Sequence, residues 1–122
     1  MTRILLAEDH AAVRVGLAAF FEAQDDFEVV ATAADGRQAV ALAGKLAPDF
    51  VLMDIRMPLL DGIEATRLIK AARPETRVIL LSAYEQDDLV EAGAAAGAES
   101  FMLKGVPGAE LVAAIRKLRG SA

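Results

Sequence analysis

The chain has 122 residues, 55% of them apolar and 25% charged, and 13 Lys and Arg against 18 Asp and Glu give a net charge of −5. A domain of this length can bury a core without cross-links, and the absence of cysteine excludes a disulfide scaffold and a cysteine-based zinc site. The apolar runs are far shorter than the ~20 residues of a membrane span, and no signal peptide follows Met1, so we expect a cytoplasmic chain without membrane contact.

Short aliphatic runs alternate with longer stretches of helical period from the N-terminus onward. Residues 4–7 and 27–32 are predicted strands, and an amphipathic helix lies between them. The apolar positions of this helix are Val13, Leu17, Phe20 and Phe21. The aromatic residues that we expect in the core are Phe20, Phe21, Phe27 and Phe50.

The middle of the chain predicts a third strand between two helices. The first helix is expected over residues 35–46 and the strand over residues 50–53. The spacing of Asp61 and Glu64 matches a capping box, in which each side chain binds an amide at the start of the next helix. The core face of that helix is assigned to Ile63, Leu68 and Ile69.

Residues 77–81 and 100–103 are two further predicted strands, each followed by a helix. The helix between them starts in an acidic segment, which suits the positive end of the helix dipole, and ends before Gly97. The acidic residues of its first turn are Glu85, Asp87 and Asp88. The last helix begins near Pro107, and its apolar stripe is Leu111, Ile115 and Leu118. The cations that compensate its dipole are Arg116, Lys117 and Arg119.

Five strands that are each followed by a helix predict an α/β fold built from right-handed crossovers. The sheet is expected to be parallel and covered on both faces by five helices, because its strands lack the polar alternation of half-exposed strands. The basic residues near the C-terminus are too few to make a nucleic-acid surface.

Polar residues follow four of the five predicted strands. Glu8 and Asp9 follow the first, Asp54 the third, Ser82 the fourth and Lys104 the fifth. The carboxyl ends of parallel strands share one edge, where ligands bind, so we expect these groups to converge. Three carboxylates at close range either take up a proton or hold a cation, and oxygen ligands of this kind suit Mg²⁺. The same charge argues against a dinucleotide site.

Four separated segments carry motifs that agree in type, order and spacing with one known family. They are ILLAEDH at 4–10, VLMDIRMP at 51–58 with Asp61-Gly62, LLSA at 80–83, and Gly97-Ala98 followed by FMLK at 101–104. Across essentially the whole chain they resemble a response-regulator receiver domain (CheY-like), most of all receivers joined to a LuxR/NarL-type DNA-binding domain. The resemblance implies a doubly wound, flavodoxin-like sheet with strand order 2-1-3-4-5.

The resemblance also implies roles for the residues at the strand ends. Asp54 matches the phosphoacceptor, whose carboxylate takes a phosphoryl group from a sensor histidine kinase. Asp9, Asp54 and the backbone carbonyl of Arg56 match the Mg²⁺ ligands, with Glu8 acting mostly through a bound water. Lys104 matches the basic residue that pairs with the phosphoryl oxygens.

Two further pairs of residues match the switch and the timing of the family. Ser82 matches the hydroxyl that hydrogen-bonds the phosphoryl group, and Phe101 the aromatic residue whose rotamer follows it. Their movement is expected to remodel the face made by the fourth helix, fifth strand and fifth helix. Arg56 and Tyr84, two residues past Asp54 and Ser82, stand where the family tunes the lifetime of the acyl phosphate, and their bulk predicts slow hydrolysis.

Two other residues near the predicted site carry weaker signals. His10, the single histidine, is assigned to the start of the first helix rather than to metal binding or catalysis, because phosphotransfer draws its histidine from the partner. Gly105 follows Lys104 where many receivers have proline, which leaves the isomer of the Lys104–Gly105 peptide open.

The expected module catalyses its own phosphorylation and dephosphorylation without being a turnover enzyme. Its implied partners are a sensor histidine kinase, a second copy of the chain on phosphorylation, and DNA only through an output domain outside these residues. We assign residues 1–119 to the receiver and 120–122 to a linker or tail, and we favour a piece of a transcriptional regulator over a stand-alone receiver.

Two other functions remain as alternatives. The first is an interaction domain that works without phosphorylation, against which the combined presence of the acidic residues, Ser82 and Lys104 argues. The second is an Asp-nucleophile phosphatase of the haloacid-dehalogenase type, which places a second Asp two residues after the nucleophile, where this chain has Arg56.

Overall fold

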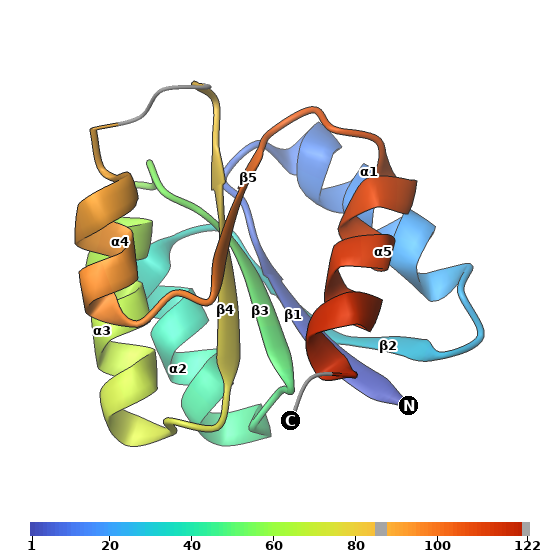
Figure 1. Ribbon diagram of the computed structural model, residues 1–122, viewed down its shortest axis with the longest axis horizontal. Coiled ribbons are helices and arrows are strands. Elements are labelled where there is room, and N and C mark those ends of the chain that lie inside the picture. Colours follow the sequence, from blue (N-terminus) through green and yellow to red (C-terminus); the bar gives the residue numbers. More distant parts are fainter. Residues whose placement is uncertain (85–87, 121–122) are drawn as a thin grey trace.

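The computed structural model of the chain describes residues 1–84 and 88–120. Its five strands form one parallel sheet in the order β2-β1-β3-β4-β5, which confirms the predicted order (Figure 1). The strands are β1 (Thr2–Ala7), β2 (Phe27–Ala33), β3 (Phe50–Asp54), β4 (Arg77–Ser82) and β5 (Ser100–Leu103). The helices are α1 (Ala11–Glu22), α2 (Gly36–Leu46), α3 (Gly62–Ala72), α4 (Val90–Ala96) and α5 (Gly108–Arg119). Within the described residues, no helix is both long and apolar enough to span a membrane.

Two apolar layers cover the two faces of the sheet. Helices α2, α3 and α4 lie on one face, and α1 and α5 on the other (Figure 1). Successive residues of a strand point to opposite faces, so Leu5 packs in the first layer while Ile4 and Leu6 pack in the second. All three are buried, which is why the central strands read as unbroken aliphatic runs.

Three residues that were assigned to buried helix faces lie at the surface instead. Val13 is 42% exposed, Phe20 36% and Leu68 43%. Val13 and Phe20 form a row along the rim of the buried stripe of α1, whereas Phe21, about 100° further round the helix, is fully buried. Leu68 likewise points outward while the residue after it faces the core. The Phe20 ring lies over Gly108 at the start of α5, so it closes the seam between the two helices.

Helix α4 is shorter than the sequence predicts. It begins at Val90, so Asp88 lies in the turn before it and the first turn carries Glu91 instead. Asp favours turns because its side chain competes for backbone amides. The other predicted first-turn acids lie outside the described residues: Glu85 and Asp87. The helix ends as predicted at Gly97, which has a left-handed φ of 109°.

The caps of α2 and α3 are largely as predicted. Asp35 Oδ1 accepts a hydrogen bond from Gln38 N, and Asp61 Oδ1 accepts one from Glu64 N, both at 2.8 Å. The reciprocal half of the capping box is wrong, because the Glu64 carboxylate pairs with Arg67 one turn further along α3. An arginine within reach on the same face therefore outcompetes the backbone amide for Glu64.

Two arginines in the last turn of α5 bind a residue in the loop before β2, in addition to compensating the helix dipole. Arg116 makes a bidentate pair with Asp26, in the loop before β2, at 3.0 and 2.8 Å. Arg119 reaches the same carboxylate at 2.6 Å and Thr2 Oγ1 at 2.7 Å. Hydrogen bonds from Arg116 and then Arg119 hold the pKa of the Asp26 carboxyl well below its usual value of 3.8. Asp26 thus ties the end of α5 to the edge of the sheet.

Gly62 allows α3 to start directly against the end of β3. Its N–H donates to Ile55 O at 2.7 Å. A Cβ at this position would lie 2.2 Å from Asp54 O and 2.9 Å from Ile55 Cα, so any side chain would displace the backbone that carries Asp54. The Asp-Gly pair therefore fixes both the helix start and the position of the strand end.

We predict that Gly62→Ala destabilises the fold by about 1–3 kcal/mol, because the added methyl group overlaps backbone atoms that cannot move freely. The matched control is Gly16→Ala in the middle of α1, where a Cβ has nothing within 4 Å. That variant is expected to gain about 0.5–1 kcal/mol from helix propensity. Urea unfolding measures both, and a stable Gly62→Ala variant contradicts the close approach.

We also predict that Asp26→Asn lowers the thermal unfolding midpoint at neutral pH. A carboxyl whose pKa is depressed by folding stabilises the fold above its unfolded-state pKa, here about 3.8, and loses this contribution as the pH falls further. The difference from the wild type should therefore shrink below that pH. Asp25→Asn removes the same charge from an exposed neighbour and should cost less. Equal effects of the two variants contradict a stabilising role for the Asp26 ion pairs with Arg116 and Arg119.

Candidate functional site

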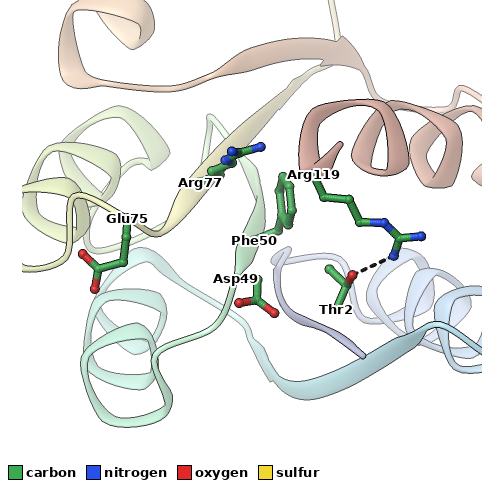
Figure 2. A pocket seen from close by; sticks show the side chains of 6 residues that line it. All are labelled: Thr2, Asp49, Phe50, Glu75, Arg77 and Arg119. Carbon is green, nitrogen blue, oxygen red and sulfur yellow. Dashed lines mark hydrogen bonds between the residues drawn. The ribbon is translucent and has the colours of Figure 1, made fainter. Parts of the chain in front are cut away.

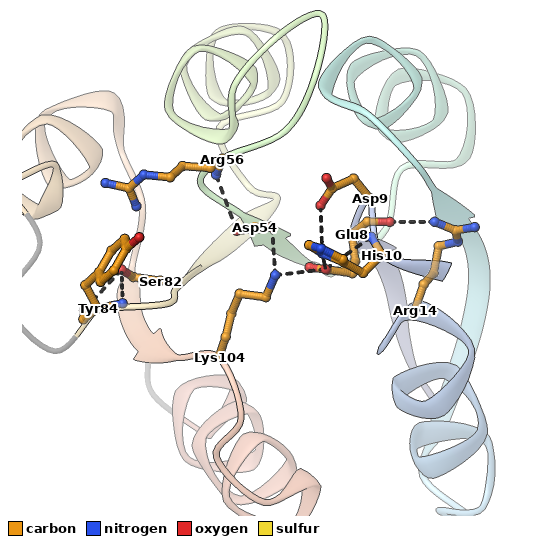
Figure 3. Close-up of polar contacts among 9 residues, drawn as sticks. All are labelled: Glu8, Asp9, His10, Arg14, Asp54, Arg56, Ser82, Tyr84 and Lys104. Carbon is orange, nitrogen blue, oxygen red and sulfur yellow. Dashed lines mark hydrogen bonds and ion pairs between the residues drawn. The ribbon is translucent and has the colours of Figure 1, made fainter. Parts of the chain in front are cut away.

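The residues at the ends of four neighbouring strands lie at the carboxyl edge of the sheet. Strands β1, β3, β4 and β5 are neighbours in that order, and their last residues pair in register, for example Ala7 with Met53 and Ser82 with Leu103. The side chains of Glu8, Asp54 and Lys104 converge as predicted, with Lys104 reaching from the end of β5 toward the two carboxylates, whereas Ser82 lies beside Tyr84 (Figure 3).

Lys104 joins the two buried carboxylates of the site. Its Nζ donates to Asp54 Oδ2 and to Glu8 Oε1, each at 2.9 Å. The side chains of Glu8 and Asp54 are only 2% and 6% exposed. Burial raises the pKa of Asp54, against the opposing hydrogen bond from Lys104. Burial alone lowers the pKa of Lys104, but the hydrogen bonds to Glu8 and Asp54 outweigh it and raise the pKa.

The acidic group extends from Glu8 to Asp9 and His10. One ligand atom from each of these residues and from Asp54 lies within 4.8 Å of the others. Two carboxylate oxygens, Glu8 Oε2 and Asp9 Oδ1, are buried and lack a hydrogen bond among the described residues. Buried oxygens that lack donors fit a hard divalent cation, which prefers oxygen ligands, so this donor set is suited to hold one.

His10 lies closer to the acidic group than the sequence analysis expected. It stands just before α1 as the N-cap residue, but its side chain makes no capping bond. Its Nδ1 lies 3.0 Å from Glu8 Oε1 and 3.3 Å from Asp9 Oδ1. Arg14, which the sequence analysis missed, donates to the Glu8 carbonyl at 2.6 Å. A cation in the first turn of α1, three residues after its start at Ala11, was the available signal.

Arg56 contacts the site through its backbone and reaches the segment after β4 through its side chain. Its N–H donates to Asp54 Oδ1 at 3.3 Å, and its guanidinium carbon lies 5.0 Å from the centre of the Tyr84 ring. The structure therefore brings together the two residues predicted to tune the lifetime (Figure 3). The role of the Arg56 carbonyl as a ligand stays a prediction.

The Ser82 hydroxyl is turned onto the peptide group of Tyr84. Its Oγ donates to Tyr84 O and accepts from Tyr84 N, both at 3.1 Å. Phe101, on the neighbouring strand β5, is half-buried against Leu80 and Gly93. A Cβ added to Gly93 would lie 2.3 Å from the Phe101 ring. A hollow of about 110 Å³ separates the serine from the ring, and its lining includes Val90. The predicted switch residues thus share one cavity.

The backbone after Lys104 settles the open question about the following peptide. The Lys104–Gly105 peptide is trans, and Gly105 has a φ of 90°. Proline, whose φ is fixed near −65°, cannot adopt this conformation. The glycine therefore shapes the turn that leads from the site to α5.

A second hollow lies at the opposite edge of the sheet, where the strands begin. It measures about 220 Å³ (Figure 2), and its lining is Thr2, Asp49, Phe50, Glu75, Arg77 and Arg119. Its charged groups serve the fold: Asp49 accepts from the backbone of Arg3 at 2.8 Å, and Arg119 binds Thr2 and Asp26.

Comparison with known proteins agrees with this geometry. Residues 4–116 match the family model described as a response regulator receiver domain. Over 116 residues the chain is 47% identical to the transcriptional regulatory protein LiaR of Bacillus subtilis, covering 95% of this chain and 55% of LiaR. The chain thus spans about half the length of the curated relatives that it matches.

Two solved structures are similar over nearly the whole chain. A DNA-binding response regulator of the LuxR family from Staphylococcus aureus matches with a TM-score of 0.92 at 26% identity, covering 98% of this chain and 100% of that one. CheY of Borrelia burgdorferi, in its complex with CheX, BeF₃ and Mg²⁺, matches with a TM-score of 0.90 at 28% identity, covering 98% and 90%. The chain belongs to the receiver domain family of two-component response regulators and is related to the LuxR-family regulators.

Proposed function

We propose that Asp54 is a phosphoacceptor and that the chain is a switch driven by its phosphorylation. The observation that carries the proposal is the buried Asp54 carboxylate, held by Lys104 beside two buried oxygens of Glu8 and Asp9 that accept no hydrogen bond among the described residues. A phosphoryl group arriving there meets a cation that can pair with its oxygens. No comparable cluster of carboxylates forms elsewhere in the described residues.

In the proposed reaction a carboxylate oxygen of Asp54 attacks the phosphorus of a phosphohistidine on a sensor histidine kinase. The new bond is the acyl-phosphate O–P bond, and the P–N bond breaks as the imidazole leaves. Lys104 pairs with the phosphoryl oxygens, which concentrates positive charge where negative charge is transferred. Ser82 donates its hydroxyl hydrogen to one of them. The chain catalyses its own modification and does not turn over a substrate.

The same site is proposed to use Mg²⁺. Asp9, Asp54 and the Arg56 carbonyl are the proposed ligands, with Glu8 acting through a water. The donor set is all oxygen, and two of its carboxylate oxygens are buried without a hydrogen bond, which supports a hard cation. A related receiver, CheY of Borrelia burgdorferi, has been crystallised with BeF₃ and Mg²⁺. When bound, the ion neutralises charge that builds up during phosphoryl transfer.

The proposed output is transcriptional control through the face formed by α4, β5 and α5. Phe101 on β5 adjoins the hollow beside Ser82, so a shift of the serine can be transmitted to this face. Residues 1–119 form the proposed receiver, and the relative LiaR, a transcriptional regulatory protein, is about twice as long. We propose a DNA-binding domain after residues 120–122 and a homodimer that forms on phosphorylation.

The phosphoacceptor is tested by incubating the chain with acetyl phosphate and Mg²⁺ and measuring its intact mass. One phosphoryl group per chain is expected, and EDTA or Asp54→Asn should abolish it. Asp25→Asn, which removes an exposed carboxylate, is the matched control and should label as the wild type does. Labelling of Asp54→Asn contradicts the assignment, and a folded wild-type chain that never labels favours an interaction domain that works without phosphorylation. Size exclusion of both forms then tests the dimer.

The lifetime of the acyl phosphate is the second test. Arg56 and Tyr84 are in contact, and their backbone amides donate to Asp54 and Ser82, so their side chains are proposed to hinder the approach of water. Arg56→Asn and Tyr84→Ala should therefore each shorten the half-life several-fold in a decay assay started by removing acetyl phosphate. Unchanged half-lives remove the two residues from the proposal.

A further inference from the structure

The Ser82 hydroxyl already has a partner that competes with its proposed one. The side chain is buried, and its single hydrogen is donated to Tyr84 O at 3.1 Å. The same Ser82 oxygen accepts a hydrogen bond from Tyr84 N at 3.1 Å. The serine hydroxyl is thus bonded to both the N–H and the C=O of Tyr84. A hydroxyl has one hydrogen to donate. Ser82 therefore cannot fully serve Tyr84 O and an oxygen on Asp54 at once.

The Tyr84 side chain is held by a residue from the segment after β3. Tyr84 is 59% exposed, yet the Arg56 guanidinium carbon lies 5.0 Å from the centre of its ring (Figure 3). Arg56 in turn donates its backbone N–H to Asp54 Oδ1 at 3.3 Å. An exposed cation–π contact is worth roughly a two- to five-fold change in an equilibrium constant. The contact thus joins the segment after β3 to the segment after β4.

We propose that Arg56 and Tyr84 form a latch that holds Ser82 away from Asp54 in the unphosphorylated chain. The stack keeps the Tyr84 peptide where it takes the serine hydrogen, and so it opposes capture of the phosphoryl group by Ser82. This inference rests on the proposed function, in which Ser82 donates to a phosphoryl oxygen on Asp54. Tyr84 acts through Ser82 and is therefore a positioning residue.

The coupling runs in both directions. A phosphoryl oxygen is charged and accepts a stronger hydrogen bond than the neutral Tyr84 carbonyl, so phosphorylation draws the serine away and loosens the stack. By thermodynamic linkage, loss of the stack must strengthen binding of any phosphoryl analogue to the same extent. The latch requires Ser82, whereas simple obstruction of water does not. Removal of the hydroxyl therefore separates the two effects.

The test measures the affinity for beryllofluoride in the presence of Mg²⁺ by isothermal titration calorimetry, for the wild type and for variants. Tyr84→Ala and Arg56→Ala should each tighten binding two- to five-fold, and the double variant should gain no more than one of them. Tyr84→Phe keeps the ring and should restore most of the wild-type affinity. In a Ser82→Ala background, the Tyr84→Ala change should have no effect.

The chain offers a direct readout of the latch, since Tyr84 is its single tyrosine and tryptophan is absent. Beryllofluoride should change the tyrosine emission of the wild type, and this change should be lost in Ser82→Ala. Additive gains in the double variant, or tighter binding by Tyr84→Ala without the serine, overturn the latch. Asp54-dependent binding by the wild type with no change in any variant overturns the latch alone. A folded wild type that binds no beryllofluoride overturns the proposed function and the latch together.

Discussion

The ion pair of Lys104 with Asp54 and Glu8 is the interaction on which the rest of the site depends. Two carboxylates with side chains less than a tenth exposed repel each other and lose hydration, and one ammonium at 2.9 Å from each offsets both costs. The balance is incomplete, because Asp9 adds a third carboxylate and two buried carboxylate oxygens accept no hydrogen bond from any residue that the structure describes. The resting site is therefore stable enough to persist and still has an excess of negative charge that favours a divalent cation.

The fold delivers this arrangement through the order of its strands. Asp54 ends the strand between those that carry Glu8 and Ser82, so it stands at the centre of the carboxyl edge, and Lys104 arrives from β5 beyond them. Gly62 keeps the end of β3 in place because no side chain separates α3 from Asp54. At the other end of the sheet, Asp26 holds the last turn of α5. The proposed latch joins the segment after β3 to Tyr84, two residues after β4.

Much of the fold could be predicted because its signals are local. Aliphatic runs, the Asp caps of α2 and α3 and the left-handed Gly97 each depend on neighbours within a few residues, and the structure confirms them. The prediction that Phe20 is buried in the core was wrong because the helical period shows which side of α1 is apolar but not how many residues on that side are covered. The contact of Phe20 with Gly108 depends on where α5 packs. The convergence of Glu8, Asp54, Ser82 and Lys104 was also predictable, since parallel strands bring their carboxyl ends to one edge.

By itself, the sequence determined the parallel α/β architecture, the residues at the strand ends and the excess of negative charge among them. Tertiary structure alone decided which side chains of different loops and helix ends contact each other: Arg116 and Arg119 with Asp26, His10 with Glu8, and Arg56 with Tyr84. The physical reason is the distance along the chain over which each effect acts. Hydrophobic periodicity and secondary-structure propensity act within one helical turn or one strand. The partner of a long, flexible Arg or Lys side chain depends on which loops the folded sheet brings within its reach.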